Sequence, residues 1–108
     1  MPAKVIHIRD LQPSDTLRPD ATSFLESLSE EELQRLGLPQ VWNIDGKLII
    51  SDGNQRTAIA AKKGKTIIQV DYQGKVPEYM NNFKEIVLNN VRLLQESGVN
   101  NPYDLWQT

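Results

Sequence analysis

Hydrophobic and polar positions change their period several times along this chain, and each change marks an expected element. Near the N-terminus, residues 4–8 alternate between the two kinds and predict a short strand, while the proline-containing segment 11–20 predicts a loop. Hydrophobic residues then recur at helical spacing over 24–36, and Ser29 with Glu32 has the form of a capping box. We therefore expect a helix that is broken or capped again near Ser29.

The middle of the chain has the pattern of a hairpin followed by a helix. Asp45 and Gly46 lie between two runs rich in strand-forming residues, and this dipeptide is the strongest short signal for a hairpin turn. The alanine-rich segment that starts near Asn54 predicts a helix ending at Gly64. Residues 66–72 predict one more strand.

The last third of the chain predicts its longest helix, over residues 77–97. Pro77 is favoured in the first turn of a helix, and hydrophobic side chains follow at helical spacing. We expect one stripe of these side chains to be buried against the sheet or another chain. Its members are Tyr79, Phe83, Ile86, Val87 and Leu94. In the tail, Tyr103 and Trp106 are expected to cover the core, with docking of a partner as the alternative.

The order of these elements predicts the fold class. A strand, a helix, a hairpin, a helix, a strand and a helix give an α+β protein with a small mixed β-sheet and packed helices. A chain of 108 residues is long enough for one hydrophobic core. We assign residues 1–76 to the domain itself and residues 77–108 to a C-terminal helical extension packed on the same domain, through which the chain could form oligomers.

Composition excludes several kinds of chemistry. The chain has no Cys, which removes thiol catalysis, disulfides and thiolate metal sites and suits a reducing cytoplasm. Its single histidine, His7, argues against a zinc site; we assign no metal ligand, and the sequence does not identify a cofactor. No hydrophobic run has the roughly 18 residues that a membrane span needs. We expect a soluble, cytoplasmic protein without a membrane partner.

Charge is distributed unevenly around the junction between the hairpin and the following helix. The formal net charge is only -2, but residues 10–36 are strongly acidic. Residues 46–75 carry six Lys or Arg residues against two Asp residues. This local excess of positive charge is typical of a solvated surface, and it also suits an anionic ligand.

The junction itself, residues 52–56, is the candidate binding site. The first turn of a helix has amide N–H groups without internal partners and attracts anions, phosphate above all. Gly53 permits close approach of a ligand, and Arg56 adds a forked donor. Further neutral donors come from Asn54, Gln55 and Thr57.

Asp52 is the carboxylate next to this site and therefore the first candidate for a catalytic residue, as a general base or as the ligand of a divalent ion. An equally simple alternative makes Asp52 the N-cap of the helix and Arg56 a surface residue. Glu30, Glu31 and Glu32 belong to the first turn of a helix, where they stabilise its dipole, rather than to a catalytic pair.

The run IDGKLIISDGNQRTAIAAKKGKTIIQVDY, with VIHIRDLQPSDTLRP and LGLPQVW upstream of it, resembles the ParB/sulfiredoxin-like superfamily over about residues 4–72. In that superfamily a hairpin leads into a Gly-x-x-Arg motif that opens a helix and lines a nucleotide or phosphate pocket. Gly53 and Arg56 are the matching positions. The resemblance implies a nucleotide or another phosphate-bearing ligand, with nucleic acid as an alternative.

Departures from the superfamily pattern narrow the function. Sulfiredoxins carry a catalytic Cys where this chain has Asn54, so sulfiredoxin activity is excluded. Partition proteins have charged residues where this chain has Asn54 and Gln55, which argues against metal-dependent hydrolysis of a nucleotide. Three hypotheses remain: a phosphate- or nucleotide-binding ParB-like module, a metal-dependent nuclease or phosphotransferase, and a protein-interaction domain with a degenerate motif.

Overall fold

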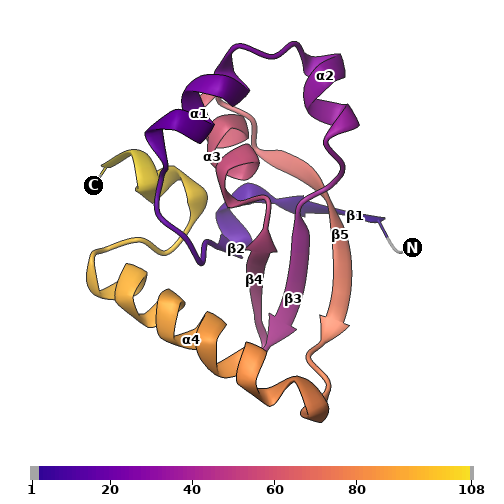
Figure 1. Cartoon of the computed structure of the whole chain (residues 1–108), viewed down its shortest axis with the longest axis vertical. Coiled ribbons are helices and arrows are strands. Elements are labelled where there is room, and N and C mark those ends of the chain that lie inside the picture. The colour runs from indigo at the N-terminus through magenta and orange to yellow at the C-terminus, as the bar shows by residue number, and fades with distance from the viewer. Residues whose placement is uncertain (1–2, 108) are drawn as a thin grey trace.

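A five-stranded sheet of mixed strand direction forms the body of the protein (Figure 1). The computed structural model describes residues 3–107. Its strands are β1 Ala3–His7, β2 Leu11–Gln12, β3 Gln40–Ile44, β4 Lys47–Asp52 and β5 Ile67–Lys75. Its α-helices are α1 Pro19–Glu26, α2 Glu30–Arg35, α3 Asn54–Lys62 and α4 Asn81–Glu96, and its 3-10 helices are η1 Ile8–Asp10, η2 Glu78–Met80 and η3 Pro102–Gln107.

The strands follow one another across the sheet in the order β1-β5-β3-β4-β2. β1 pairs with β5, and β3 with β4, in antiparallel direction. β3 pairs with β5, and β2 with β4, in parallel direction. The predicted α+β class with a small mixed sheet is confirmed.

β3 and β4 form the expected hairpin. At its turn, Asp45 and Gly46 have φ angles of 52° and 84°, and two successive positive φ angles are what a two-residue turn between twisted strands requires. The side chain of Asn43 supports the turn, because its Oδ1 accepts a hydrogen bond of 3.0 Å from the amide of Gly46. The local sequence was therefore sufficient to predict this element.

The N-terminal third differs in part from the expectation. The segment 11–20 contains the short strand β2 in addition to a loop, and α1 already begins at Pro19. β2 has only two residues, both buried, and it pairs with β4, which is distant in the sequence. It is therefore too short to show an alternating pattern that could predict a strand. The expected break near Ser29 is confirmed: Ser29 Oγ accepts from the Glu32 amide at 3.2 Å, and the Glu32 carboxylate accepts from the Ser29 amide at 3.0 Å.

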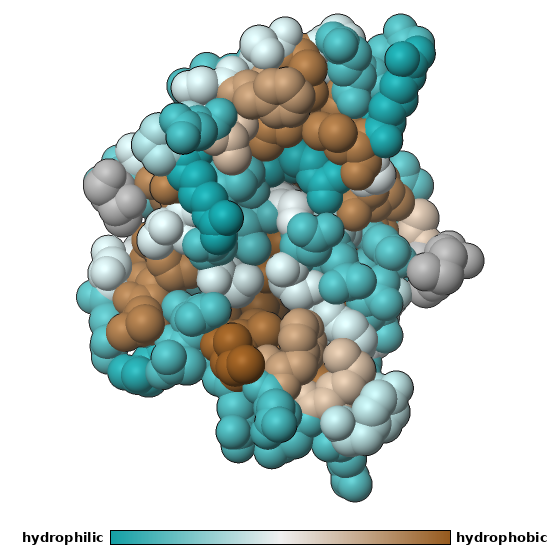
Figure 2. Space-filling model, viewed as in Figure 1, coloured by the Kyte–Doolittle hydropathy of each residue, from teal (hydrophilic) through white to brown (hydrophobic). Residues whose placement is uncertain are grey.

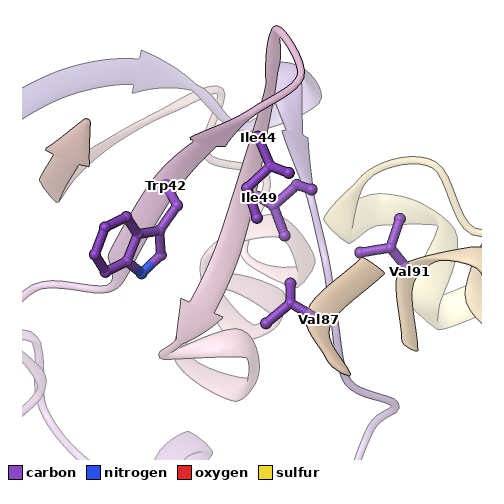
Figure 3. Close-up of a cluster of buried hydrophobic side chains, with 5 residues drawn as sticks. All are labelled: Trp42, Ile44, Ile49, Val87 and Val91. Carbon is purple, nitrogen blue, oxygen red and sulfur yellow. The ribbon is translucent and has the colours of Figure 1, made fainter. Parts of the chain in front are cut away.

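Both faces of the sheet are buried, and α4 covers one of them. In Figure 3, Val87 and Val91 of α4 lie against the hydrophobic side chains of β3 and β4. The Trp42 ring of this cluster lies 5.5 Å from the ring of Phe83, measured between centroids. The opposite face of the sheet is lined by a second buried cluster, which consists of Leu11, Val41, Ile50 and Val70.

The C-terminal tail covers α3, as expected for its two aromatic residues. Trp106 Nε1 donates a hydrogen bond of 2.8 Å to the carbonyl oxygen of Ala58, and the Tyr103 hydroxyl donates to the carbonyl oxygen of Lys65. A further buried cluster joins α3, α4 and the tail, and it consists of Ala58, Leu94, Val99 and Leu105. Residues on both sides of position 76 therefore share one core, while the domain boundary drawn there stays a prediction.

The stripe expected to be buried on the last helix is partly wrong. Tyr79 is 87% exposed and Ile86 is 63% exposed, whereas Val87 and Leu94 are buried. Ile86 precedes Val87 by one residue, which turns its side chain about 100° around the helix axis. The sequence pattern thus merged two neighbouring stripes, of which only one faces the sheet. Neither α4 nor any other helix within residues 3–107 is long and apolar enough to cross a membrane.

Candidate functional site

The predicted site lies at the junction of β4 and α3, and α3 begins at Asn54 as expected. Gly53 is the N-cap residue of α3, with φ of 89° in the left-handed region. A Cβ atom placed on Gly53 would lie 2.8 Å from the Cα of Pro39 and 2.9 Å from Nη2 of Arg56. The glycine is therefore required by the packing of the chain against Pro39, independently of any ligand.

Two of the expected ligand-binding side chains fasten the preceding loop. Asn54 is buried; its Oδ1 accepts from the Ser14 amide at 2.9 Å, and its Nδ2 donates to Ser14 Oγ at 3.2 Å. Gln55 Oε1 accepts from the Arg18 amide at 2.9 Å, and Gln55 Nε2 donates to the Thr16 carbonyl at 2.7 Å. These amides thus position the loop before α1, and a ligand would have to compete for them.

Arg56 and Thr57 are likewise engaged within the protein. Nη1 of Arg56 donates to the carbonyl oxygens of Leu36 and Gly37 at 2.5 and 3.0 Å, which satisfies carbonyls at the C-terminal end of α2. Thr57 is fully buried, and its hydroxyl donates to the carbonyl oxygen of Gly53 at 2.9 Å. Arg56 therefore joins the end of α2 to the start of α3. The sequence had predicted that its guanidinium would be free to bind a ligand.

A cleft of about 500 Å³ nevertheless opens at this junction, between α1 and the first turn of α3. No side chain caps α3, because its N-cap residue is a glycine, so the amides of the first turn are left for solvent or a ligand. The residues lining the cleft come from the loop before α1, from α1, from Leu36 and from the end of β4 through the start of α3. Residues 52–56 all belong to this lining.

Two residues of the cleft were missed by the sequence reasoning. Arg18 borders the cleft with an exposed side chain, and its Nη2 lies 2.7 Å from Oδ2 of Asp15. Phe24 lines the cleft and is 59% exposed. Helical spacing had placed Phe24 with the residues that face the core, and no local signal distinguishes it. Figure 2 shows hydrophobic side chains at the surface around α1 and α2, at the top of the view.

Asp52, the candidate catalytic residue, is exposed at the end of β4. Its Oδ2 lies 3.7 Å from Nη2 of Arg56. The side chain of Asp52 does not cap α3, whose N-cap residue is Gly53. Asp15 lines the same cleft, so the fold brings two carboxylates to it. Within residues 3–107, no three His, Cys, Asp or Glu side chains are grouped so that they could hold a metal ion.

The lysines around the junction are paired with acidic residues of α1 and α2. Lys62 Nζ lies 2.8 Å from Glu26, while Lys63 and Lys65 lie 3.3 and 2.8 Å from the carboxylate of Glu30. Hydrogen bonds from Lys65 and Lys63 lower the pKa of Glu30. These three lysines are thus neutralised locally, and none of them lines the cleft.

Comparison with known proteins adds no relative. A scan against models of protein families finds no match, and a search of curated proteins finds no significantly similar sequence. The α+β fold class is therefore known from the structure alone, and membership of the ParB/sulfiredoxin-like superfamily stays a prediction.

Proposed function

We propose that the protein is a phosphate- or nucleotide-binding module of ParB-like type, and that its ligand binds in the cleft between α1 and α3. The observation that carries this proposal is the uncapped N-terminus of α3, which opens into a cleft of about 500 Å³. A helix of nine residues adds the positive end of its dipole to these free amides. Phosphate is the anion that best matches several converging N–H donors.

The cleft also suits the remaining parts of a nucleotide. Phe24 presents an exposed aromatic ring beside the apolar side chains of Ala21, Leu25 and Leu36. Every nucleobase has a flat π-face, and stacking on an aromatic side chain contributes about 1 to 3 kcal/mol per base. A phosphate at the first turn of α3 and a base on Phe24 would use both walls of the cleft.

Arg18 takes the role that the sequence assigned to Arg56. Its side chain is 69% exposed, and its Nη2 pairs with Oδ2 of Asp15 at 2.7 Å. An arginine hydrogen-bonded to phosphate contributes about 1.5 to 3 kcal/mol. Because a phosphate would have to displace a carboxylate from this arginine, the affinity is moderate and decreases as salt rises.

Calorimetric titration with nucleoside triphosphates and with inorganic pyrophosphate, with and without Mg²⁺, tests the proposal. Arg18→Ala should weaken both ligands by about ten-fold or more, in line with the loss of one charged hydrogen bond. Phe24→Ala should weaken nucleotides alone, because pyrophosphate has no base to stack. Both side chains are exposed, so neither variant should reduce the stability of the fold.

Lys47→Ala is the matched control. It removes the same charge from the other end of β4, roughly 17 Å from Asp52 at about 3.3 Å per residue. Binding that is absent at low salt, or that Arg18→Ala and Lys47→Ala weaken equally, contradicts the proposed site. Product formation that requires Mg²⁺ and is lost in Asp52→Asn would replace the binding module with the nuclease or phosphotransferase alternative.

A further inference from the structure

The outer side of α4 carries a stripe of exposed apolar residues that the cleft does not use. Tyr79 in η2, then Ile86 and Leu93 in α4, are 87%, 63% and 50% exposed. Ile86 and Leu93 are spaced seven residues apart within α4, and this spacing returns side chains to nearly the same side of a helix, as in the seam of a coiled coil, while Tyr79 precedes the helix in η2. The stripe is distinct from the side of α4 that packs on the sheet.

We propose that this stripe is the contact surface of a homodimer, in which two copies of α4 pack antiparallel to one another. A two-fold axis beside Asn89 and Asn90 places Ile86 of each copy against Leu93 of the other. Ile86 and Leu93 then each gain an apolar partner. This surface is separate from the cleft, so the inference does not depend on the proposed function.

Charges beside the stripe select the antiparallel arrangement. Glu85 and Arg92 are seven residues apart and lie on the same flank of the stripe. When two helices pack antiparallel around the same axis, each flank meets the same flank of the second copy, so Glu85 faces Arg92 of the second copy and the reverse. A parallel pair would bring this flank against the opposite one, where Asn90 and Ser97 are uncharged.

The surroundings of the stripe fit a second copy of the same helix. Within its own helix, Arg92 donates from Nη2 to Oδ1 of Asn89 at 2.7 Å, and its Nη1 lies 3.2 Å from Oε2 of Glu96. Glu85 of the second copy would therefore add a second carboxylate to this arginine. The stripe is only one residue wide and is bordered by Asn82, Asn89 and Asn90, so a partner of similar width is the best match. α4 lies along the lower edge of the molecule in Figure 1, with no other element beyond it. Asparagine in such a seam fixes its register and reduces its stability.

The dimer is expected to be weak, since each copy contributes few apolar side chains. Sedimentation equilibrium from about 10 µM to about 1 mM should show a shift from 12.3 kDa toward twice that mass, within the range of weak association. Ile86→Lys should weaken the dimer by about ten-fold or more, because it buries an unpaired charge. The control is Val5→Lys, which changes an equally exposed apolar residue on β1 and should leave the dimer unchanged.

Reversing the charges tests the orientation. Glu85→Arg and Arg92→Glu should each weaken the dimer by about two- to ten-fold, because each creates two like-charge contacts, and the double variant should restore it. A dimer that survives Ile86→Lys overturns the proposed surface, and single variants without effect overturn the antiparallel pairing. A chain that stays monomeric to about 1 mM overturns the dimer. If that monomer sediments with vesicles of anionic phospholipid, the stripe contacts lipid instead.

Discussion

Gly53→Ala measures how closely the start of α3 is packed against Pro39. An alanine at φ of 89° costs about 1 to 2 kcal/mol, because a Cβ atom disfavours the left-handed conformation. The same Cβ would lie 2.8 Å from the backbone Cα of Pro39, closer than real Cβ contacts, so the chain must shift. Such overpacking costs about 1 to 3 kcal/mol more. We expect a total loss of about 2 to 5 kcal/mol.

Gly64→Ala is the matched control at the other end of the same helix. Gly64 has a similar φ of 81°, but a Cβ atom placed there meets nothing within 4 Å. The control therefore carries the conformational cost without the contact with Pro39. Any stabilisation from a less flexible unfolded chain is shared by the two variants, so it cancels in their difference.

Urea denaturation of both variants gives the comparison directly. Gly53→Ala should lose about 1 to 3 kcal/mol more than Gly64→Ala, which corresponds to roughly 4 to 12 °C in melting temperature for a domain of this size. If the two variants lose the same stability, Pro39 does not confine Gly53, and the packing reason given for this glycine is wrong.

Two further predictions concern α4 and α2. Phe83→Ala should cost about 2 to 4 kcal/mol in urea denaturation because its ring packs on Trp42, whereas Tyr79→Ala should stay within about 0.5 kcal/mol; equal losses would contradict the observed orientation of the helix. Hydrogen bonds from Ser29 lower the pKa of Glu32 below 4.5, so the cap stabilises α2 above that pH and is lost as the pH falls through the lowered value. The protection factors of the α2 amides, which correct for the slower intrinsic exchange in acid, should fall as the pH drops, and less so in Glu32→Gln; protection that is constant from about pH 6 to about pH 3 would refute this.

The elements that the sequence predicted are those whose signals lie close together in the chain. The Asp45-Gly46 turn needs only two residues with positive φ, and the capping box of Ser29 and Glu32 closes within three positions. The start of α3 also follows a local rule, because Gly53 interrupts a strand pattern before an alanine-rich run.

The features that the sequence did not predict depend on contacts between distant segments. Arg56 stabilises the end of α2, and nothing near Arg56 in the sequence indicates the carbonyls of Leu36 and Gly37 as its partners. Phe24 is exposed because the neighbouring Leu25 occupies the buried position of α1, and helical spacing alone does not separate them. The sequence therefore located the cleft through residues 52–56, but it did not predict the opposite wall, which α1 and the loop before it form.

The attachment of α2 gives this cleft an adjustable boundary. α2 has no buried residue, and it is held by polar contacts at its two ends, from Lys63 and Lys65 to Glu30 and from Arg56 to the carbonyls that follow the helix. Water can replace each of these contacts, so the free energy for opening this segment alone is low compared with that of the sheet. Pro39 stays fixed, since its carbonyl accepts from the Asp71 amide at 2.8 Å. Leu36, which follows α2, lines the cleft, so local opening of this segment would move one lining residue of the cleft while the core of the sheet stays intact.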